Sequence, residues 1–253
     1  MKIAIITGAS SGLGRAYIDA IIKMYPQINE IWLVARRKER LQEITEQYPK
    51  DKCKAIGLDL SNMESIQIMK ELLAQSKPDI KLLVSNSGVA YGGDFKDVDL
   101  MRQMDMVDLN VRGAMAITHI CLPYMRKGSH IIETCSVSAF APTPKQIVYS
   151  ATKECLLFFC KGLREELKPY GINVCALCPG NMATEMNVKE VKIESKSASG
   201  KMPFLDINKV AEKSLKSVKK GKAVCTPGIV YKGYRLLAKI FPHNLIMKFS
   251  KMG

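Results

Sequence analysis

The stretch Lys2-Ile-Ala-Ile-Ile-Thr-Gly-Ala-Ser-Ser-Gly-Leu-Gly14 decides the fold of this chain. A run of strand-forming residues leads into a glycine-rich loop, and a segment with apolar residues at helical spacing follows it. Glycines let such a loop turn tightly and approach a pyrophosphate, while the helix start supplies free N–H groups and positive dipole charge. A tight turn without a ligand is the alternative, but the position between strand and helix favours a dinucleotide site. Its predicted members are Gly8, Ser10, Ser11, Gly12, Leu13 and Gly14.

Short apolar runs alternate with segments of helical length along most of the chain, which is typical of a parallel sheet flanked by helices. The expected strands are Lys2–Thr7, Glu30–Ala35, Lys54–Asp59, Leu82–Ser85, His130–Cys135 and Asn173–Leu177. The expected helices are Arg15–Met24, Lys38–Tyr48, Ser61–Gln75, Leu100–Met125 and Tyr149–Tyr170. These units predict one α/β domain over residues 1–253, with a doubly wound (Rossmann) parallel sheet and helices on both faces. Its ligand crevice should lie at the carboxyl ends of the strands.

Length and composition indicate an ordinary globular protein. The chain has 253 residues, of which 47% are hydrophobic and 25% are charged. These values exclude a disordered, collagen-like or coiled-coil protein, and no apolar window reaches the roughly 18 residues of a membrane span. The apolar run before Gly8 is too short for a secretory signal, so we expect a cytoplasmic protein.

The cysteines predict neither a disulfide framework nor a metal site. All eight are scattered along the chain, so reduced thiols are expected. Cys175 and Cys178 have the CxxC spacing of a redox motif or half a zinc site. No second CxxC completes four ligands and the three histidines are dispersed. We therefore interpret both cysteines as small buried side chains of the last core strand.

Positive charge is concentrated towards the C-terminal end. The net charge is +14, and the residues from Met186 to Gly253 include 15 Lys or Arg against 4 Asp or Glu. Such an excess could attract nucleic acid, anionic lipid or a phosphorylated ligand, or it could form a solvated surface. No nucleic-acid-binding motif accompanies it, and aromatic residues make up only 7% of the chain. We therefore expect no nucleic-acid partner.

The second expected strand ends in two arginines, Arg36 and Arg37. A fold that binds NAD places an acidic residue here, on the 2′-hydroxyl of the adenosine ribose. Guanidinium groups pair instead with a 2′-phosphate, through planar charge-assisted hydrogen bonds. The pair therefore favours NADP(H) as cofactor, and two solvated surface arginines are the alternative.

Three side chains that can transfer protons follow the fifth expected strand. Tyr149 and Lys153 are four residues apart on one face of a helix, and Ser136 ends the strand beside it. A nearby ammonium stabilises a phenolate and lowers the pKa of a tyrosine from its usual value near 10. A serine hydroxyl can hold a substrate oxygen against the phenol. The three predict a general acid or base, although Tyr-x-x-x-Lys alone is common on exposed helices.

In combination these motifs resemble the short-chain dehydrogenase/reductase family over residues 2–184. Leu58-Asp-Leu60 is similar to the family segment beside the adenine, and Asn86-Ser-Gly88 stands where Asn-Ala-Gly is usual. Asn110 resembles the asparagine that completes a catalytic tetrad with Ser136, Tyr149 and Lys153. The resemblance implies further cofactor contacts from Asp59, Leu60, Asn86, Ser87, Gly88, Tyr149, Lys153, Pro179, Gly180, Met182 and Thr184.

The resemblance implies hydride transfer between a nicotinamide and a carbonyl or carbinol carbon. Tyr149 would exchange a proton with the substrate oxygen, which Ser136 would steady. Lys153 would lower the pKa of Tyr149 and bind the nicotinamide ribose, and Asn110 would hold a water that passes protons towards Lys153. Reduction with NADPH is the expected direction. The alternative is an NADP(H)-binding sensor or scaffold without turnover, which has no need of such a phenol.

Two regions are expected to define the substrate. Residues 181–203 are rich in Lys, Ser and Asn and form a candidate lid, or a surface loop without function. Residues 229–253 are apolar with interspersed cations. In the family the C-terminal part supplies specificity, so an apolar wall suggests a lipophilic substrate such as a steroid or long-chain ketone. Small polar carbonyls are the alternative, and the segment could instead pack on the core or a partner subunit, or lie on a membrane surface.

The resemblance also implies subunit association, through the helical segments Leu100–Met125 and Tyr149–Lys168. Spare apolar area on the second segment is expected from Leu156, Phe158, Phe159 and Leu163. A homodimer or homotetramer is therefore expected.

Overall fold

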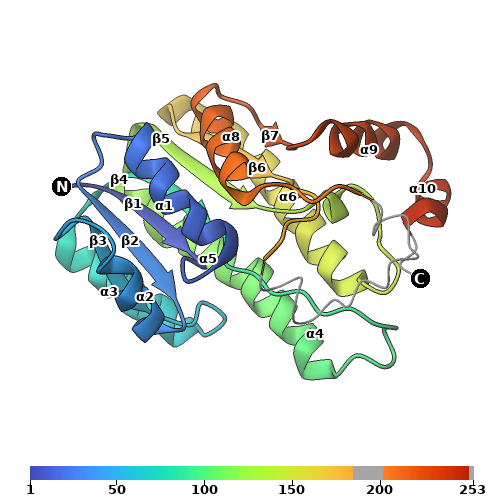
Figure 1. Ribbon diagram of the computed structural model, residues 1–253, viewed down its shortest axis with the longest axis horizontal. Coiled ribbons are helices and arrows are strands. Elements are labelled where there is room, and N and C mark those ends of the chain that lie inside the picture. The colour runs from blue at the N-terminus through green and yellow to red at the C-terminus, as the bar shows by residue number, and fades with distance from the viewer. Residues whose placement is uncertain (185–201, 251–253) are drawn as a thin grey trace.

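Seven parallel strands form the centre of the computed structural model, which describes residues 1–184 and 202–250 (Figure 1). Their order across the sheet is β3-β2-β1-β4-β5-β6-β7. The strands are β1 Lys2–Thr7, β2 Glu30–Ala35, β3 Cys53–Gly57, β4 Asp79–Ser85, β5 Met125–Thr134, β6 Asn173–Leu177 and β7 Val224–Cys225. Successive strands are added on one side of β1 as far as β3 and on its other side from β4 onwards. This switch leaves a crevice beyond the carboxyl ends of β1 and β4. The predicted doubly wound sheet is confirmed.

Helices cover both faces of the sheet (Figure 1). Because side chains alternate along a strand, Ala4 and Ile6 of β1 point to one face, and Ile3 and Ile5 point to the other. The helices on the first face are α1 Gly12–Met24, α2 Lys38–Thr45 and α8 Ile207–Lys219. Those on the second face are α3 Met63–Ser76, α5 Ala114–Cys121 and α6 Ile147–Leu167. Burial on both faces explains why the strands are continuous apolar runs in the sequence.

The number of strands differs from the prediction. Six were expected, and the described residues include a seventh, β7, which pairs with Ala176 and Leu177 of β6. A strand of two residues is too short to carry a periodic pattern, so it could not be recognised in advance.

The expected helix Leu100–Met125 is wrong as a single element. It is divided into α4 (Leu100–Val107), a π-helical segment η1 (Asp108–Gly113), α5 and a short turn at Leu122–Tyr124. Pro123 in this turn lacks the backbone N–H that a continuing helix needs. Met125 is already the first residue of β5, which therefore begins before the expected start at His130.

Other elements are confirmed with shifted ends. β4 begins at Asp79 rather than Leu82, and α2 ends at Thr45 rather than Tyr48. α6 ends at Leu167, and a 3-10 turn continues to Tyr170. All eight cysteines are free, and Cys175 and Cys178 are fully buried, as expected.

The C-terminal region forms α9 (Ile229–Ile240) and α10 (His243–Ser250) at one end of the molecule, beyond β7 (Figure 1). α9 buries Tyr231 and Ala238, whereas other apolar side chains of the helix reach solvent, among them Ile229, which is 80% exposed. Most of the expected lid, residues 185–201, lies outside the described residues. No helix within the described ranges is long and apolar enough to cross a bilayer.

The apolar face expected on α6 is smaller than predicted. Leu156 and Leu163 are buried in the protein's own core, where they pack with the second face of the sheet. Phe159 is partly buried against the same core, whereas Phe158 is 78% exposed. Only Phe158 of the four therefore extends fully into solvent.

Candidate active site

A cavity of about 830 Å³ opens at the carboxyl ends of the strands, where the winding reverses. Its walls come from the loops after β1, β2, β3 and β4, from the start of α6, from the segment after β6 and from α9. Every site residue predicted from the sequence lines this cavity except Gly14 and Asn110. Those two residues lie behind its wall.

Close packing explains the glycines of the loop after β1. Gly8 has a φ of 65°, a conformation that is strained for residues with a side chain. A Cβ atom on Gly14 would lie 2.1 Å from the carbonyl oxygen of Gly8. Ser11 precedes α1 but makes no capping hydrogen bond through its side chain. The N-terminus of α1, which lines the cavity, can therefore bind a phosphate group.

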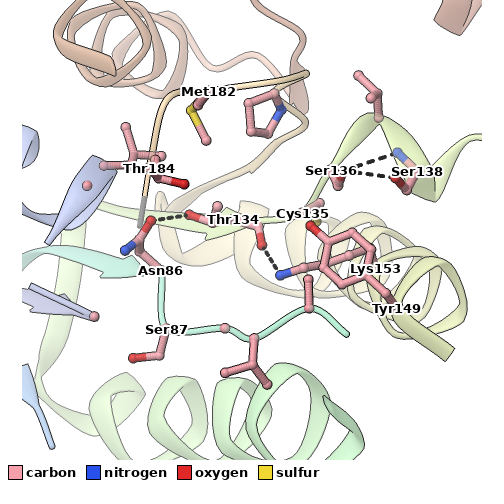
Figure 2. Close-up of a pocket in the computed structure, with 18 of the residues that line it drawn as sticks. Asn86, Ser87, Thr134, Cys135, Ser136, Ser138, Tyr149, Lys153, Met182 and Thr184 are labelled. Carbon is pink, nitrogen blue, oxygen red and sulfur yellow. Dashed lines mark hydrogen bonds between the residues drawn. The ribbon is translucent and has the colours of Figure 1, made fainter. Parts of the chain in front are cut away.

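Thr7, which sequence reasoning missed, joins the end of β1 to the loop after β4. Its Oγ1 accepts hydrogen bonds from the backbone N–H groups of Asn86 at 2.8 Å and Ser87 at 2.9 Å. The Asn86 side chain donates to the Thr7 carbonyl at 3.1 Å and accepts from the Thr134 hydroxyl at 3.4 Å (Figure 2). The ends of three strands are thus held together at the base of the cavity.

The adenosine end of the cavity is defined by charged side chains after β2 and β3. Arg36 and Arg37 are exposed and line the cavity, and Arg37 Nη2 donates to Ser10 Oγ at 3.2 Å. Asp59 Oδ1 accepts from the N–H and the hydroxyl of Ser61, at 3.0 and 2.7 Å. The Arg37 guanidinium therefore lies beside the glycine loop, where its charge would also attract a phosphate bound to that loop.

Asn110 is fully buried in the π-helical segment η1. Its Oδ1 accepts from the N–H of Val89, and its Nδ2 donates to the Val89 carbonyl, both at 2.9 Å. Nδ2 also lies 3.2 Å from Thr152 Oγ1 on α6. A Cβ atom on Gly88 would approach Asn110 Oδ1 to 3.0 Å and Lys153 Nζ to 3.3 Å. Asn110 therefore connects η1, the loop after β4 and the helix that carries Lys153.

Ser136 and Tyr149 line the cavity from the segment after β5 and from the first turn of α6. Ser136 Oγ accepts from the N–H of Ser138 at 3.2 Å (Figure 2). Tyr149 lies in the first turn of α6; burial raises the pKa of its phenol, and a hydrogen bond with Ser136 opposes this rise. The phenol is therefore protonated at neutral pH and can donate a proton to a neighbouring oxygen.

Lys153 is buried, and its Nζ donates to the carbonyl oxygen of Thr134 at 2.9 Å (Figure 2). Nζ lies 5.7 Å from the centre of the Tyr149 ring. Burial lowers the pKa of Lys153 itself. The net lowering of the Tyr149 pKa expected from the sequence is not found in this structure, because burial of the phenol outweighs the effects that oppose it.

Tyr231 of α9 anchors both described ends of the segment 181–203. Its hydroxyl accepts from the N–H of Asn181 at 3.0 Å and donates to the carbonyl oxygen of Pro203 at 2.8 Å. Only a glycine fits at Gly180, since a Cβ atom there would lie 2.0 Å from the Tyr231 ring. Thr184 reaches the glycine loop, with its Cγ2 3.1 Å from where a Cβ atom on Gly12 would lie.

Sequence reasoning missed Glu133 in β5 and Cys135 directly after it, whereas the contribution of the C-terminal segment was expected. Cys135 lines the cavity, and Glu133, on the same face of the strand, is fully buried. Thr118 donates to Glu133 Oε1 at 2.5 Å, and burial raises the pKa of this carboxyl to about 8. The α9 side chains at the cavity are Val230, Tyr231, Tyr234 and Leu237. An acidic residue in the middle of an apolar strand was the available signal for Glu133.

The fold is that of a doubly wound α/β protein, and its cavity lies where such folds bind their ligands. The sequence profile of the family described as short chain dehydrogenase matches residues 2–195. An uncharacterized oxidoreductase from Staphylococcus epidermidis is 33% identical over 187 residues, which cover 73% of this chain and 80% of the relative. This protein therefore belongs to the short-chain dehydrogenase family and is an oxidoreductase of that family.

Solved structures share the fold at lower identity. A short-chain dehydrogenase from Sphingobium yanoikuyae in complex with NADPH has a TM-score of 0.78 and 23% identity, over 96% of this chain and 97% of that one. A short-chain dehydrogenase/reductase from Burkholderia phymatum in complex with NAD has a TM-score of 0.79 and 19% identity, over 93% and 92%. Proteins with this fold thus bind either nicotinamide dinucleotide.

Proposed function

We propose that this protein is an NADP(H)-dependent reductase of lipophilic carbonyl compounds. The observation that carries the proposal is the convergence of the glycine loop, Ser136, Tyr149 and Lys153 on one cavity. Membership of a family of oxidoreductases supports hydride transfer as the reaction. The apolar side chains of α9 in the same cavity support a lipophilic substrate.

The cavity suits a nicotinamide dinucleotide, which supplies or accepts the hydride when bound. The N-terminus of α1 holds the pyrophosphate, because its N–H groups and dipole favour anions. Arg36 and Arg37 hold the 2′-phosphate that distinguishes NADP(H) from NAD(H). Lys153 donates one of its three N–H groups to the carbonyl oxygen of Thr134, and the other two can donate to the ribose hydroxyls.

Tyr149 and Ser136 handle the substrate oxygen. Ser136 positions the carbonyl oxygen, and Tyr149 donates its proton to that oxygen as negative charge develops there. The raised pKa of Tyr149 keeps the donor protonated in the resting enzyme. The positive charge of Lys153 then stabilises the phenolate that remains, since both side chains line the same cavity.

The catalytic part of the proposal is tested by replacing Tyr149 with phenylalanine. Turnover should fall by at least the ~10² to 10⁴ that a positioned proton donor supplies, while NADPH binding stays nearly intact. Tyr170→Phe removes a hydroxyl from an exposed tyrosine and serves as the control. Near-normal turnover of Tyr149→Phe contradicts the mechanism. Tight NADPH binding by a wild-type protein that reduces no carbonyl would instead support the sensor.

The cofactor preference is tested with Arg36→Ala. Loss of a charge-assisted contact of about 1.5–3 kcal/mol should weaken NADPH binding roughly 10- to 150-fold and leave NADH binding almost unchanged. Arg126→Ala, which removes an exposed arginine outside the cavity, should change neither affinity. Equal affinity of the wild type for NADH and NADPH would refute the preference for NADP(H).

The substrate class is tested at two neighbouring leucines of α9. Leu237 lines the cavity, whereas Leu236 does not, and the two are 48% and 58% exposed. Leu237→Ser should lower kcat/KM for a steroid or long-chain ketone about tenfold, because roughly half of a leucine's burial energy is lost. Leu236→Ser should keep kcat/KM unchanged. Equal efficiency of the wild type with short polar ketones would refute a lipophilic substrate.

A further inference from the structure

A second groove of about 380 Å³ lies between α8, β7 and α9, and shares no lining residue with the active-site cavity. Five of its ten lining residues are cations, and none of the ten is acidic: the cations are Lys213, Lys222, Lys232, Arg235 and Lys239. The positive charge that the sequence concentrates towards its C-terminal end is thus gathered in part around one concave surface.

Different faces of the helix α9 line the two sites. Lys232, Leu236 and Lys239 recur at the spacing of one helical face, and all three line the groove. Tyr231 and Tyr234 line the active-site cavity instead. Ligands of the two sites would therefore contact different faces of the same helix.

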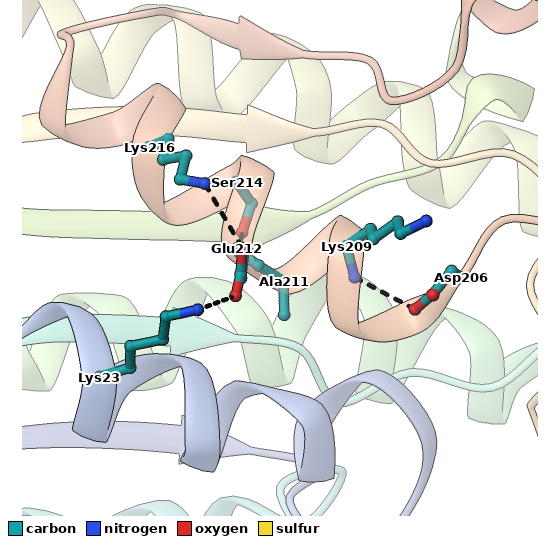
Figure 3. Close-up of polar contacts among 7 residues, drawn as sticks. All are labelled: Lys23, Asp206, Lys209, Ala211, Glu212, Ser214 and Lys216. Atoms are coloured by element: carbon teal, nitrogen blue, oxygen red, sulfur yellow. Dashed lines mark hydrogen bonds and ion pairs between the residues drawn. The ribbon is translucent and has the colours of Figure 1, made fainter.

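The lysines of the groove have no acidic partner among residues 1–184 and 202–250. Glu212, the acidic residue of α8, pairs with Lys23 at 3.0 Å and Lys216 at 3.4 Å, neither of which lines the groove (Figure 3). Asp206 is also occupied, because its Oδ1 accepts from the N–H groups at the start of α8 (Figure 3). Uncompensated like charges repel, so this arrangement favours binding of an anion.

Three of these cations influence the pKa of Cys225, a buried residue that lines the groove. Burial raises the pKa of the Cys225 thiol, and the charges of Lys213, Lys222 and Lys232 oppose that rise. Arg235 lies 5.7 Å from the centre of the Phe140 ring. Lysines of the groove are thus close enough to the buried Cys225 to influence its thiol.

An unpaired hydroxyl provides independent evidence for a ligand. Thr226 follows β7 directly, lines the groove and is only 4% exposed. Its Oγ1 is buried and has no hydrogen-bond partner among the described residues. Buried polar atoms are almost always paired, so an unpaired hydroxyl on a residue that lines this cationic groove points to a missing partner at the groove.

We propose that this groove binds a phosphate group, at a site distinct from the dinucleotide cavity. Phosphate oxygens accept hydrogen bonds from ammonium, guanidinium and hydroxyl groups, and a phosphate carries enough charge to offset several lysines. Leu236 and Val224 add apolar surface to the same groove. The ligand is therefore a phosphorylated molecule, either a soluble phosphate ester or the headgroup of a lipid.

The test compares two double variants that lose the same charge. Lys222→Gln with Lys232→Gln removes two cations from the groove, and Lys209→Gln with Lys220→Gln removes two exposed cations that do not line it. Binding of glycerol 3-phosphate is measured by calorimetry at constant ionic strength. The groove variant should bind at least roughly tenfold more weakly than the wild type, and the control should bind as the wild type does.

Thr226→Val separates the hydroxyl from the charges, because it keeps the shape of the side chain. It should weaken binding by a smaller factor than the lysine variant, without changing NADPH affinity. All variants are checked for folding by thermal unfolding. In phosphate-free buffer the groove variant should unfold at a higher temperature than the wild type, since repulsion is relieved.

Vesicles distinguish the two sources of phosphate. A lipid headgroup is identified if the wild type sediments with phosphatidylglycerol vesicles but not with phosphatidylcholine vesicles, and if the groove variant no longer sediments with either. Binding of glycerol 3-phosphate without vesicle binding identifies a soluble ester. Unchanged binding in the groove variant, equal weakening in the control, or no binding of either probe to the wild type would overturn the proposal.

Discussion

Replacing Glu133 with glutamine should stabilise the folded protein at alkaline pH. The carboxyl is fully buried in β5, beneath the strand end that leads to Ser136. Burial raises its pKa from 4.5 to about 8, and hydrogen bonds from Thr118 and Ser85 and the charge of Lys153 offset only part of that rise. The folded protein therefore holds Glu133 protonated at neutral pH, whereas the unfolded chain ionises it.

The sign of the pH dependence follows from this difference. Between pH 4.5 and about 8 the folded state binds the proton and the unfolded state does not, so the free energy of unfolding falls as pH rises. At about 1.4 kcal/mol per pH unit, the interval corresponds to a loss on the order of 5 kcal/mol. That loss is comparable to a large part of the roughly 5–15 kcal/mol by which domains are stable.

Urea unfolding at about pH 5 and about pH 9 measures the effect. The wild type should lose several kcal/mol over this range relative to Glu133→Gln, because glutamine stays neutral and can still accept from Thr118. Glu154→Gln, which removes an exposed carboxylate from α6, should follow the wild-type profile. Parallel pH profiles for the wild type and Glu133→Gln would show that Glu133 is ionised in the folded state and refute the reasoning.

Three further perturbations test the packing around the site and the proposed association of subunits. Gly14→Ala should weaken NADPH and NADH alike in a calorimetric titration, because a Cβ atom 2.1 Å from the Gly8 carbonyl oxygen forces the loop to shift; a preserved affinity would exclude this steric account. Asn110→Ala should lower the urea-derived free energy of unfolding by about 2–4 kcal/mol, since the N–H and carbonyl of Val89 lose their partner, and a loss below about 1 kcal/mol would mean that water replaces it. If subunits associate through α6, Phe158→Asp should reduce the mass measured by analytical ultracentrifugation, and an unchanged oligomer would place the interface elsewhere.

Local patterns were sufficient to predict most strands and the glycine loop. A buried parallel strand must be apolar on both sides, so β1, β2 and β6 stand out as continuous apolar runs. The loop after β1 is equally local, because tight turning and close approach require glycine at fixed spacing. β7 has only two residues, and its place in the sheet depends on hydrogen bonds to β6 that no local pattern encodes.

The sequence by itself determined the class of fold, the glycine loop and the residue types at the cavity, because these depend on periodicity and on spacing within single elements. Tertiary structure alone decided the environment of each group. Burial raised the pKa of Tyr149 where the sequence predicted a lowering, and Lys153 was directed to the Thr134 carbonyl. The cationic groove likewise depends on tertiary structure, since the lysines that line it are spread over residues 213–239 in α8, α9 and the loop before β7. Desolvation and long-range charge interactions depend on which segments meet in space, and the spacing of residues along the chain does not contain that information.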